Sequence, residues 1–276
     1  MKMIRLSKYG KLAVYVALVI YLIIVIVPFV MTIMNSFKSL ANIFLEPFSF
    51  SSLTFQNFVT AFKEANIITG YINSIIIVTI SSAGIIIVSS MLAYAISRFD
   101  FPFRRALIMY SMVGLALPVQ LAIVPIYAMM NSVHLLNTRL GLILIYIAFN
   151  ISFSSFILRN FIDYIPVEIE EAALIEGASR WKIFWYIVIP MIKPALAIVA
   201  IVNFTNIWND FFLPLIFINS NSKVTLTLAV SVFFQAYSNQ WNLLFASLTL
   251  AMLPMLIFYF ILSKQFIAGI TAGAIK

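Results

Sequence analysis

Polar side chains gather in one stretch of an otherwise apolar chain, and their types suit contact with a polyhydroxylated ligand. The stretch covers 187–218 and contains Asn203, Asn206, Trp208, Asn209 and Asp210. Amide groups can hydrogen-bond hydroxyls, and an aromatic face can pack on the C–H side of a pyranose ring. These residues are candidates for a sugar path, because polar groups are costly in hydrocarbon and normally face a partner helix or water. Helix–helix hydrogen bonding stays open for Asn203 and Asn206, and an interfacial anchor for Trp208.

Other apolar stretches could contribute to the same path. Gln120 is a further candidate. Asn73 and Asn150 are also polar residues in or near apolar stretches. Pro118 and Pro125 predict a kink, because proline frees backbone carbonyls in a helix.

A second polar segment, 158–186, interrupts the apolar chain. Pro166 suits the first turn of a helix, where its missing N–H would be unpaired anyway. Gly177 is expected to end that helix, and Ser179 to cap a second one. Ala173 and Gly177 lie four residues apart, so one helix face would offer small residues for close approach. The carboxylates near the positive end of the helix dipole are Glu168, Glu170 and Glu171. A helix that merely connects two membrane spans is the alternative interpretation.

Composition determines the class of protein. Hydrophobic residues make up 63% of the 276 residues and charged residues 9%, with a mean hydropathy of +1.08. A soluble domain carries about a quarter charged residues, so this chain must use the lipid bilayer as its solvent. The net charge of +8 indicates membrane topology and no nucleic acid partner, because the basic residues lie in short loops beside apolar runs. The chain has no cysteine, which excludes disulfides and thiolate metal sites.

The expected fold is all-α, with six transmembrane helices in one membrane domain, 1–276. Period-two alternation is absent, which argues against a barrel. Six apolar stretches are long enough for a core about 30 Å thick. The expected spans are 12–34, 71–96, 106–130, 139–157, 187–218 and 241–263. Between and after them lie an external segment, 35–70, the polar segment 158–186 and a carboxyl-terminal tail, 264–276.

The distribution of basic residues predicts the orientation. All but four of the 17 Lys and Arg lie on one side of the expected spans, and the four exceptions are Lys38, Lys63, Arg139 and Lys223. Positive charge accumulates in the cytoplasm. Both termini and the segment 158–186 are therefore expected to be cytoplasmic.

The polar segment also carries a motif. Glu171-Ala172-Ala173, Gly177 and Ile187-Val188-Ile189-Pro190 follow the spacing E-A-A-x(3)-G-x(9)-I-x-L-P. This pattern resembles the membrane subunits of binding-protein-dependent ABC importers of type I. Ile189 departs from it where Leu is usual, and Glu176 stands where relatives usually have Asp. The resemblance implies a coupling helix that fits a groove in an ATPase. The residues implied to couple are Glu170, Glu171, Ala172, Ala173, Glu176, Gly177 and Pro190.

The last third of the chain is similar to carbohydrate permeases of the maltose/oligosaccharide (MalG-like) type. Two segments carry the similarity: the W-N-D-F sequence from Trp208 to Phe211, and the ending from Gln265 to Lys276, which resembles Q-x-F-x-x-G-x-x-x-G-A-x-K. The resemblance implies that the tail contacts the ATPase through Gln265, Gly269 and Gly273. A frayed terminus is the alternative.

The resemblance also implies partners. They are a second permease subunit in a heterodimer, two ATPase subunits and an extracellular sugar-binding protein, in a bacterial cytoplasmic membrane that the chain crosses several times. ATP and Mg would be bound by the partner ATPase, because this chain has no Gly-x(4)-Gly-Lys-Ser/Thr. It is expected to carry no cofactor, no metal and no catalytic residue. Glycerol phosphate or a polyol is an alternative substrate.

Other functional classes fit less well. An ion-coupled secondary transporter usually buries several ionisable groups along its path. Here Asp210 is the one acid in or near a span outside the segment 158–186, and no half is duplicated. An intramembrane hydrolase is excluded, since the single histidine, His134, has neither a cysteine nor other histidines to form a triad or a metal site with.

Overall fold

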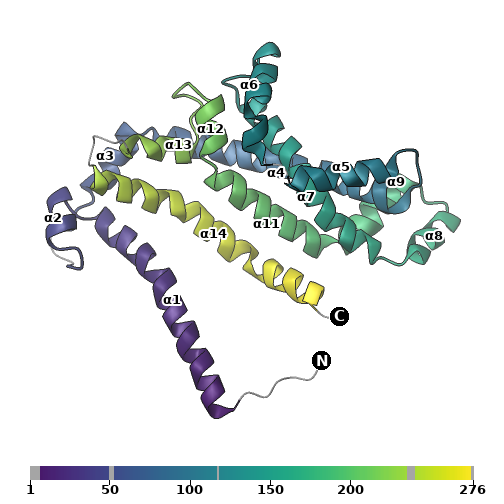
Figure 1. Ribbon diagram of the computed structural model, residues 1–276, viewed down its shortest axis with the longest axis horizontal. Helices are drawn as coiled ribbons and strands as arrows, with labels where there is room; N and C mark the ends of the chain where they lie inside the picture. Colours follow the sequence, from purple (N-terminus) through teal and green to yellow (C-terminus); the bar gives the residue numbers. More distant parts are fainter. Residues whose placement is uncertain (1–6, 50–52, 117, 235–239, 275–276) are drawn as a thin grey trace. The chain divides into compact units, whose positions relative to one another are not determined.

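The computed structural model describes residues 7–49, 53–116, 118–234 and 240–274, and over these ranges it contains helices and no strand (Figure 1). The main helices are α1 (Lys8–Ser36), α2 (Leu40–Leu45), α3 (Gln56–Glu64), α4 (Ile67–Arg98), α5 (Arg104–Ala116), α6 (Ile123–Ser132), α7 (Arg139–Asp163), α8 (Val167–Ile175), α9 (Arg180–Ile183), α10 (Ile189–Met191), α11 (Lys193–Asn209), α12 (Phe212–Phe217), α13 (Leu226–Val230) and α14 (Trp241–Ala274). Short turns of other helical types are η1 (Val119–Ala122), η2 (Phe184–Val188) and η3 (Ser231–Phe233). The expected all-α fold is confirmed.

The chain divides into two compact units. Unit 1 comprises Met1–Ile67 and Val230–Leu253, and unit 2 comprises Ile68–Ala229 and Pro254–Lys276. The long helix α14 contributes its first part to unit 1 and the rest to unit 2. The assignment of the whole chain to one membrane domain stays a prediction.

Unit 1 combines an apolar helix with a polar network. The most apolar window of α1 has a mean hydropathy of 3.0, and none of its residues is buried within the chain. Lys38 is buried, and its Nζ donates to the carbonyls of Glu46 at 2.9 Å and Pro47 at 2.8 Å. Buried Asn57 receives a hydrogen bond from Asn242 at 2.8 Å. These partners offset the desolvation of buried polar groups.

Unit 2 is built on α7, which packs against both α5 and α11. Buried serines on α4 and α7 allow close packing of apolar helices, and several hydroxyls donate back to a carbonyl of their own helix. Ser90 Oγ, for example, donates to the carbonyl of Ile86 at 2.6 Å. Such back-bonding satisfies a hydroxyl where no water is present. Within unit 2, α8 and α9 lie together at one end, away from α6 and α12 (Figure 1).

Within the described ranges, four helices are long and apolar enough to cross a membrane: α1, α4, α7 and the part of α14 from Trp241 to Ile261. Two bent helix pairs bring the number to six if each pair is one span. Helices thus occur in all six expected stretches. Where each span begins and ends in the bilayer stays a prediction.

The stretches 106–130 and 187–218 are not the single helices that their hydropathy predicted. The first is interrupted at Pro118, between α5 and η1, as its prolines indicated. In the second, Arg180–Met191 meets Lys193–Asn209 at an angle of 76°. A π-helical turn, η2, precedes this bend, and Pro190 and Pro194 flank it. Each proline removes a backbone donor, which explains why the helix breaks there.

The tail does not form a separate segment. Helix α14 continues from the sixth expected span to Ala274, so the backbone of 264–274 is helical. For the predicted ATPase contacts Gln265, Gly269 and Gly273, only the backbone belongs to the described part of the structure, so their surroundings lie outside it.

Candidate functional site

Helix α8 is the short helix that the carboxylate-rich segment predicted. It begins after Pro166, which occupies the N-cap position, one residue earlier than expected. At its other end, Gly177 N donates to the Leu174 carbonyl and Ala178 N to the Ala173 carbonyl, both at 2.9 Å. These two bonds form a Schellman motif, which satisfies carbonyls at the end of a helix.

Gly177 has a φ of +86°, in the region that favours glycine. This explains why the helix stops here. It also corrects one expectation: Gly177 lies beyond the last helical residue, so it shares no helix face with Ala173. A Cβ at Gly177 would meet no atom within 4 Å. The glycine is therefore needed for its backbone conformation and not for close packing within this chain.

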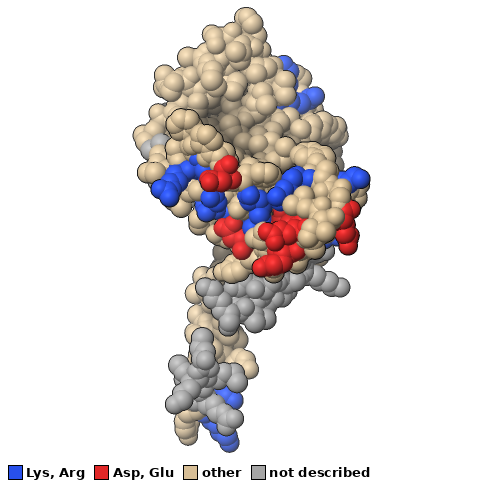
Figure 2. Space-filling view, turned by 90° about the vertical axis from the view of Figure 1, so that its right-hand side faces the viewer, with Lys and Arg blue, Asp and Glu red and all other residues tan. Residues whose placement is uncertain are grey.

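Most of the predicted coupling residues form an exposed surface, called here the α8 surface. It consists of Glu171, Ala172, Glu176 and Gly177. Ala173 is half-buried beside it. Figure 2 shows acidic and basic side chains gathered in a band at this end of the molecule, below a face with few charges. The α8 surface thus offers two carboxylates and small residues that a partner could approach closely.

Glu170 is placed differently from the prediction. Its side chain is fully buried, with Oε1 2.6 Å from Arg98 Nε. Tyr94 Oη donates to its other oxygen, Oε2, at 2.9 Å. Glu170 is therefore not a surface contact for a partner, because its carboxylate is already used inside the chain. Pro190 also lies away from α8, at the bend before α11.

The second site is a cavity of about 370 Å³ in unit 2, called here the polar cavity. Four predicted path residues line it: Gln120, Asn206, Asn209 and Asp210. Asn150, Tyr146, Phe149 and Thr205 are among the other lining residues. The cavity is built from η1, α7, α11 and the start of α12. Its size is in the range of ligand pockets, about 300–1,000 Å³. Its amides could hydrogen-bond hydroxyls.

Asp210 holds the chain at the break between α11 and α12. Its Oδ1 accepts from Phe212 N at 2.9 Å, and its Oδ2 accepts from Tyr146 Oη at 2.8 Å. Its own carbonyl accepts from Thr227 Oγ1 at 2.7 Å. Asp210 is the single charged residue among the described residues that line the polar cavity. It therefore both fixes the cavity wall and gives the cavity a negative charge.

Asn203 and Trp208 do not line the polar cavity. Asn203 is fully buried, and its Nδ2 donates to Ser154 Oγ at 3.0 Å and to the Val199 carbonyl at 2.8 Å. Trp208 stacks on Phe204 with 5.8 Å between ring centroids. Both residues thus serve packing between or along helices, which is the alternative that the sequence left open for Asn203.

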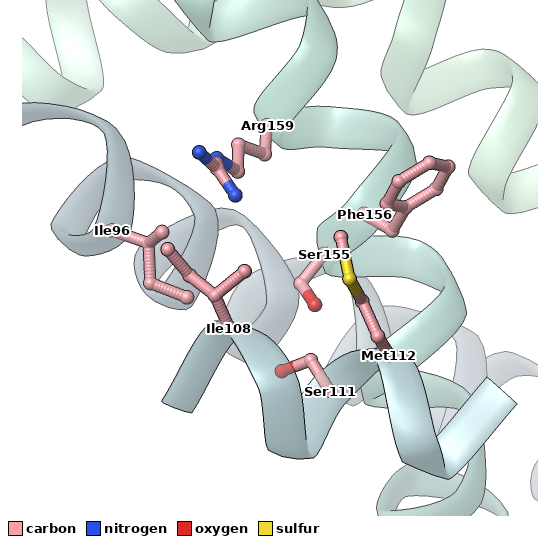
Figure 3. Close-up of a pocket in the computed structure, with 7 residues that line it drawn as sticks. All are labelled: Ile96, Ile108, Ser111, Met112, Ser155, Phe156 and Arg159. Atoms are coloured by element: carbon pink, nitrogen blue, oxygen red, sulfur yellow. The ribbon is translucent and has the colours of Figure 1, made fainter. Parts of the chain in front are cut away.

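Two other hollows are less suited to a polar ligand. One, of about 20 Å³, lies between α4, α5 and α7, with Ile96, Ile108 and Phe156 among its lining residues (Figure 3). It has room for little more than one water molecule, which needs roughly 10–15 Å³. The other, of about 230 Å³, is lined mainly by apolar and aromatic residues beside Arg180. No group of three or more metal-ligating side chains occurs among the described residues.

Three residues of these sites were missed in the sequence. Arg98 counted only as a topological charge, and neither Tyr94 nor Tyr146 was singled out. A signal exists for the first two, since Tyr94 and Arg98 lie four apart on α4 and share a helix face. Nothing in the local sequence connects them to Glu170, which lies more than seventy residues away.

Comparisons with known proteins agree with this geometry. Residues 85–271 match the family model described as binding-protein-dependent transport system inner membrane component. The chain is 36% identical over 262 residues to the diacetylchitobiose uptake system permease protein NgcG of Streptomyces coelicolor, covering 94% of this chain and 87% of the relative. It is 37% identical over 250 residues to AmyC of Thermoanaerobacterium thermosulfurigenes, named a probable starch degradation products transport system permease protein, covering 90% of this chain and 91% of the relative.

A solved structure shares the fold. It is a chain of a bacterial ABC transporter involved in the import of the acidic polysaccharide alginate. The TM-score is 0.80 at 21% identity, over 96% of this chain and 100% of that chain.

Proposed function

The chain belongs to the family of inner membrane components of binding-protein-dependent transport systems, and from this membership we propose that it is a permease subunit of an ATP-driven importer of a neutral sugar or oligosaccharide. It is a multi-pass membrane protein with the fold of type I importer permeases. The family is a non-catalytic component of ABC transporters. ATP hydrolysis, with its Mg, is assigned to a partner chain.

The polar cavity is the observation that carries the substrate class. Its amide side chains, Gln120, Asn150, Asn206 and Asn209, can donate to and accept from hydroxyls. Phe149 and Tyr146 add aromatic surface to the same wall. The names of NgcG and AmyC, which concern a disaccharide and starch products, support a sugar. Because Asp210 is the single charge among the described lining residues, a neutral sugar suits the cavity better than glycerol phosphate, whose anion Asp210 would repel.

The α8 surface is assigned to the ATPase. Glu171 offers a carboxylate to a basic residue of the partner, and Ala172, Ala173 and Gly177 allow close approach. Glu176 adds a second exposed carboxylate, while Pro190 acts through the bend before α11. The tail residues Gln265, Gly269 and Gly273 would also contact the ATPase. Two ATPase copies, a second permease and an extracellular sugar-binding protein complete the transporter, with the α8 surface and both termini in the cytoplasm.

Affinity purification of the tagged chain from its own cells tests the assembly. We expect an ATPase, a second permease and a sugar-binding protein to co-purify, and the reconstituted complex to accumulate a radiolabelled sugar only with ATP and Mg. The control is the same complex with an ATPase subunit that is inactivated by substitution in its Walker motif. Repeated recovery of this chain alone in mild detergent would contradict the proposal and favour an ion-coupled secondary transporter.

Replacing Asn206 by alanine tests the cavity assignment. We expect Asn206→Ala to weaken sugar-dependent transport by roughly two- to tenfold, since one lost hydrogen bond to a neutral ligand is worth about 0.5–1.5 kcal/mol. The matched variant is Asn203→Ala, three residues earlier, which removes a buried helix–helix bond and should lower the thermal stability of the purified chain. Equal effects of both variants on stability, with no change in transport by Asn206→Ala, would contradict the assignment.

Gly177 offers a second test. A valine there must adopt a left-handed backbone at a cost of about 1–2 kcal/mol, so Gly177→Val is expected to disturb the end of α8 and to impair transport. Gly177→Asn should retain most transport, because asparagine tolerates this conformation. Sugar uptake, divided by the amount of chain in the membrane, measures both variants. If Val and Asn transported equally well, the backbone conformation would not be the reason for this glycine.

A further inference from the structure

Helix α8 is attached to unit 2 through one buried carboxylate. All nine residues of α8 are described, and Glu170 alone among them is buried. The remaining side chains are exposed or half-buried. The short helix thus has almost no apolar core of its own. Its position depends on what Glu170 contacts.

Arg98 is the main contact of Glu170, and it connects three helices. From the carboxyl end of α4, its Nε donates to Glu170 Oε1 at 2.6 Å. Its Nη2 donates to the carbonyls of Ile162 and Ile165, both at 2.8 Å. These carbonyls lie at the end of α7 and in the turn before α8. One guanidinium therefore joins α4, the end of α7 and α8, a geometry that needs the fork of arginine donors.

The junction is shielded from water. The side chain of Arg98 is 7% exposed and that of Glu170 is 0% exposed. Tyr94, also on α4, donates to the second carboxylate oxygen. Arg180 lies further away, with its Nη1 4.0 Å from Glu170 Oε2. Buried charges interact strongly and are costly to leave unpaired. The pair therefore resists separation more than the exposed ion pair Arg159–Asp163, which lies within α7.

From this geometry we propose that Arg98 and Glu170 are positioning residues that make α8 and the carboxyl end of α4 move as one body during transport. The inference rests on the proposed function, since it assigns how a displacement of the α8 surface by the ATPase reaches a membrane helix. Glu171 would receive the partner, and its neighbour Glu170, on the inward side of the same helix, would pass the displacement to α4. Arg98 then acts through position and touches neither ATP nor sugar.

Spin labels can measure whether the distance between α8 and the carboxyl end of α4 stays constant, because the chain has no native cysteine that would also be labelled. Cysteines would replace Ile175, which is 87% exposed at the end of α8, and the exposed Asp100, which follows α4. Pulsed electron paramagnetic resonance would give the distance between the labels in the full transporter, without nucleotide and with ATP trapped. We expect one narrow distribution that is the same in both states. A distance that changes between the states in the otherwise unaltered chain would overturn the proposal.

Variants of the pair give the second arm. Glu170→Gln and Arg98→Gln are expected to broaden the label distribution and to lower the sugar transported per ATP hydrolysed by at least tenfold, with ATPase activity retained. Glu170→Asp should recover part of the ratio. Asp163→Asn, which removes a carboxylate from a nearby exposed pair, should leave the ratio unchanged. If Glu170→Gln and Arg98→Gln transported sugar at the unaltered ratio, the proposal would be wrong.

The measurements distinguish a failure of the proposed function from a failure of the positioning role. If the unaltered complex contained no ATPase or did not transport, the proposed function itself would fail. If the complex transported but the variants behaved like the unaltered chain, only the positioning role would fail. Should neither variant assemble, the label distances in the unaltered transporter still decide, because they need no substitution of the pair.

Discussion

Replacing Glu171 by lysine is expected to abolish sugar transport while leaving the chain in the membrane. Glu171 is exposed on α8, so the substitution leaves the buried pair of Arg98 and Glu170 intact. A lysine would face the basic residue of the ATPase that the carboxylate is proposed to pair with, and like charges repel. Loss of such a paired contact costs about 2–5 kcal/mol, which corresponds to a large loss of coupling. Sugar uptake and ATPase activity of the same reconstituted complex measure it.

Glu168→Lys is the matched control for this prediction. It makes the same charge change on the same helix, but in the first turn. There a cation opposes the helix dipole, at a cost of about 0.3–1 kcal/mol, so its structural effect should exceed that of Glu171→Lys. Its effect on transport should nevertheless be smaller. If Glu168→Lys were the more damaging of the two for transport, the change would act through helix stability and not through a contact of Glu171.

Replacing Asp210 by alanine is expected to cause the second large loss, of both stability and transport. The carboxylate caps Phe212 N and accepts the hydrogen bond of Tyr146, whose side chain is buried. Alanine would leave both donors without this acceptor, and each unsatisfied buried group costs about 1–3 kcal/mol. The turn between α11 and α12 forms part of the polar cavity, so its wall should shift. Thermal unfolding in detergent and sugar uptake measure the two effects.

Asp210→Asn separates the structural role from the charge. An asparagine keeps an acceptor for Phe212 N, so stability should fall far less than with alanine. The negative charge of the cavity disappears, and acidic sugars should compete better with the neutral substrate. Competition of a uronic acid with labelled neutral sugar, in Asp210→Asn and in the unaltered chain, tests this. Equal inhibition in both would show that the carboxylate does not select against anions.

Local features of the sequence predicted local structure well. Pro166 and Gly177 bracket α8, because a missing donor and a positive φ act within one turn. The roles of Glu170 and Glu171 could not be separated in the same way. Successive residues on a helix point about 100° apart, and which of the two faces inward depends on Arg98, a distant residue in the sequence.

Hydropathy indicated the length of each apolar run but not the direction of the helices within it. It indicated an apolar run over 187–218 and gave no sign of the 76° bend within it. Pro190 and Pro194 were the available signal, but Pro190 was assigned only to the motif and Pro194 was not singled out. Likewise, Asn203 and Asn206 are alike in type. Only the packing of α11 against α7 decides that Asn203 bonds Ser154 and that Asn206 lines the polar cavity.

The bend before α11 has a mechanical consequence. Two prolines and a π-helical turn leave this segment with fewer regular hydrogen bonds along its axis, so we expect its angle to change more readily than that of an unbroken helix. The buried junction of Arg98 and Glu170 is stiff by comparison. A displacement of α8 is therefore expected to pass through the buried Arg98–Glu170 pair more than through the bend before α11. Work done on α8 would reach the polar cavity mainly by way of α4 and α7, and α11 would follow by changing its tilt at the bend.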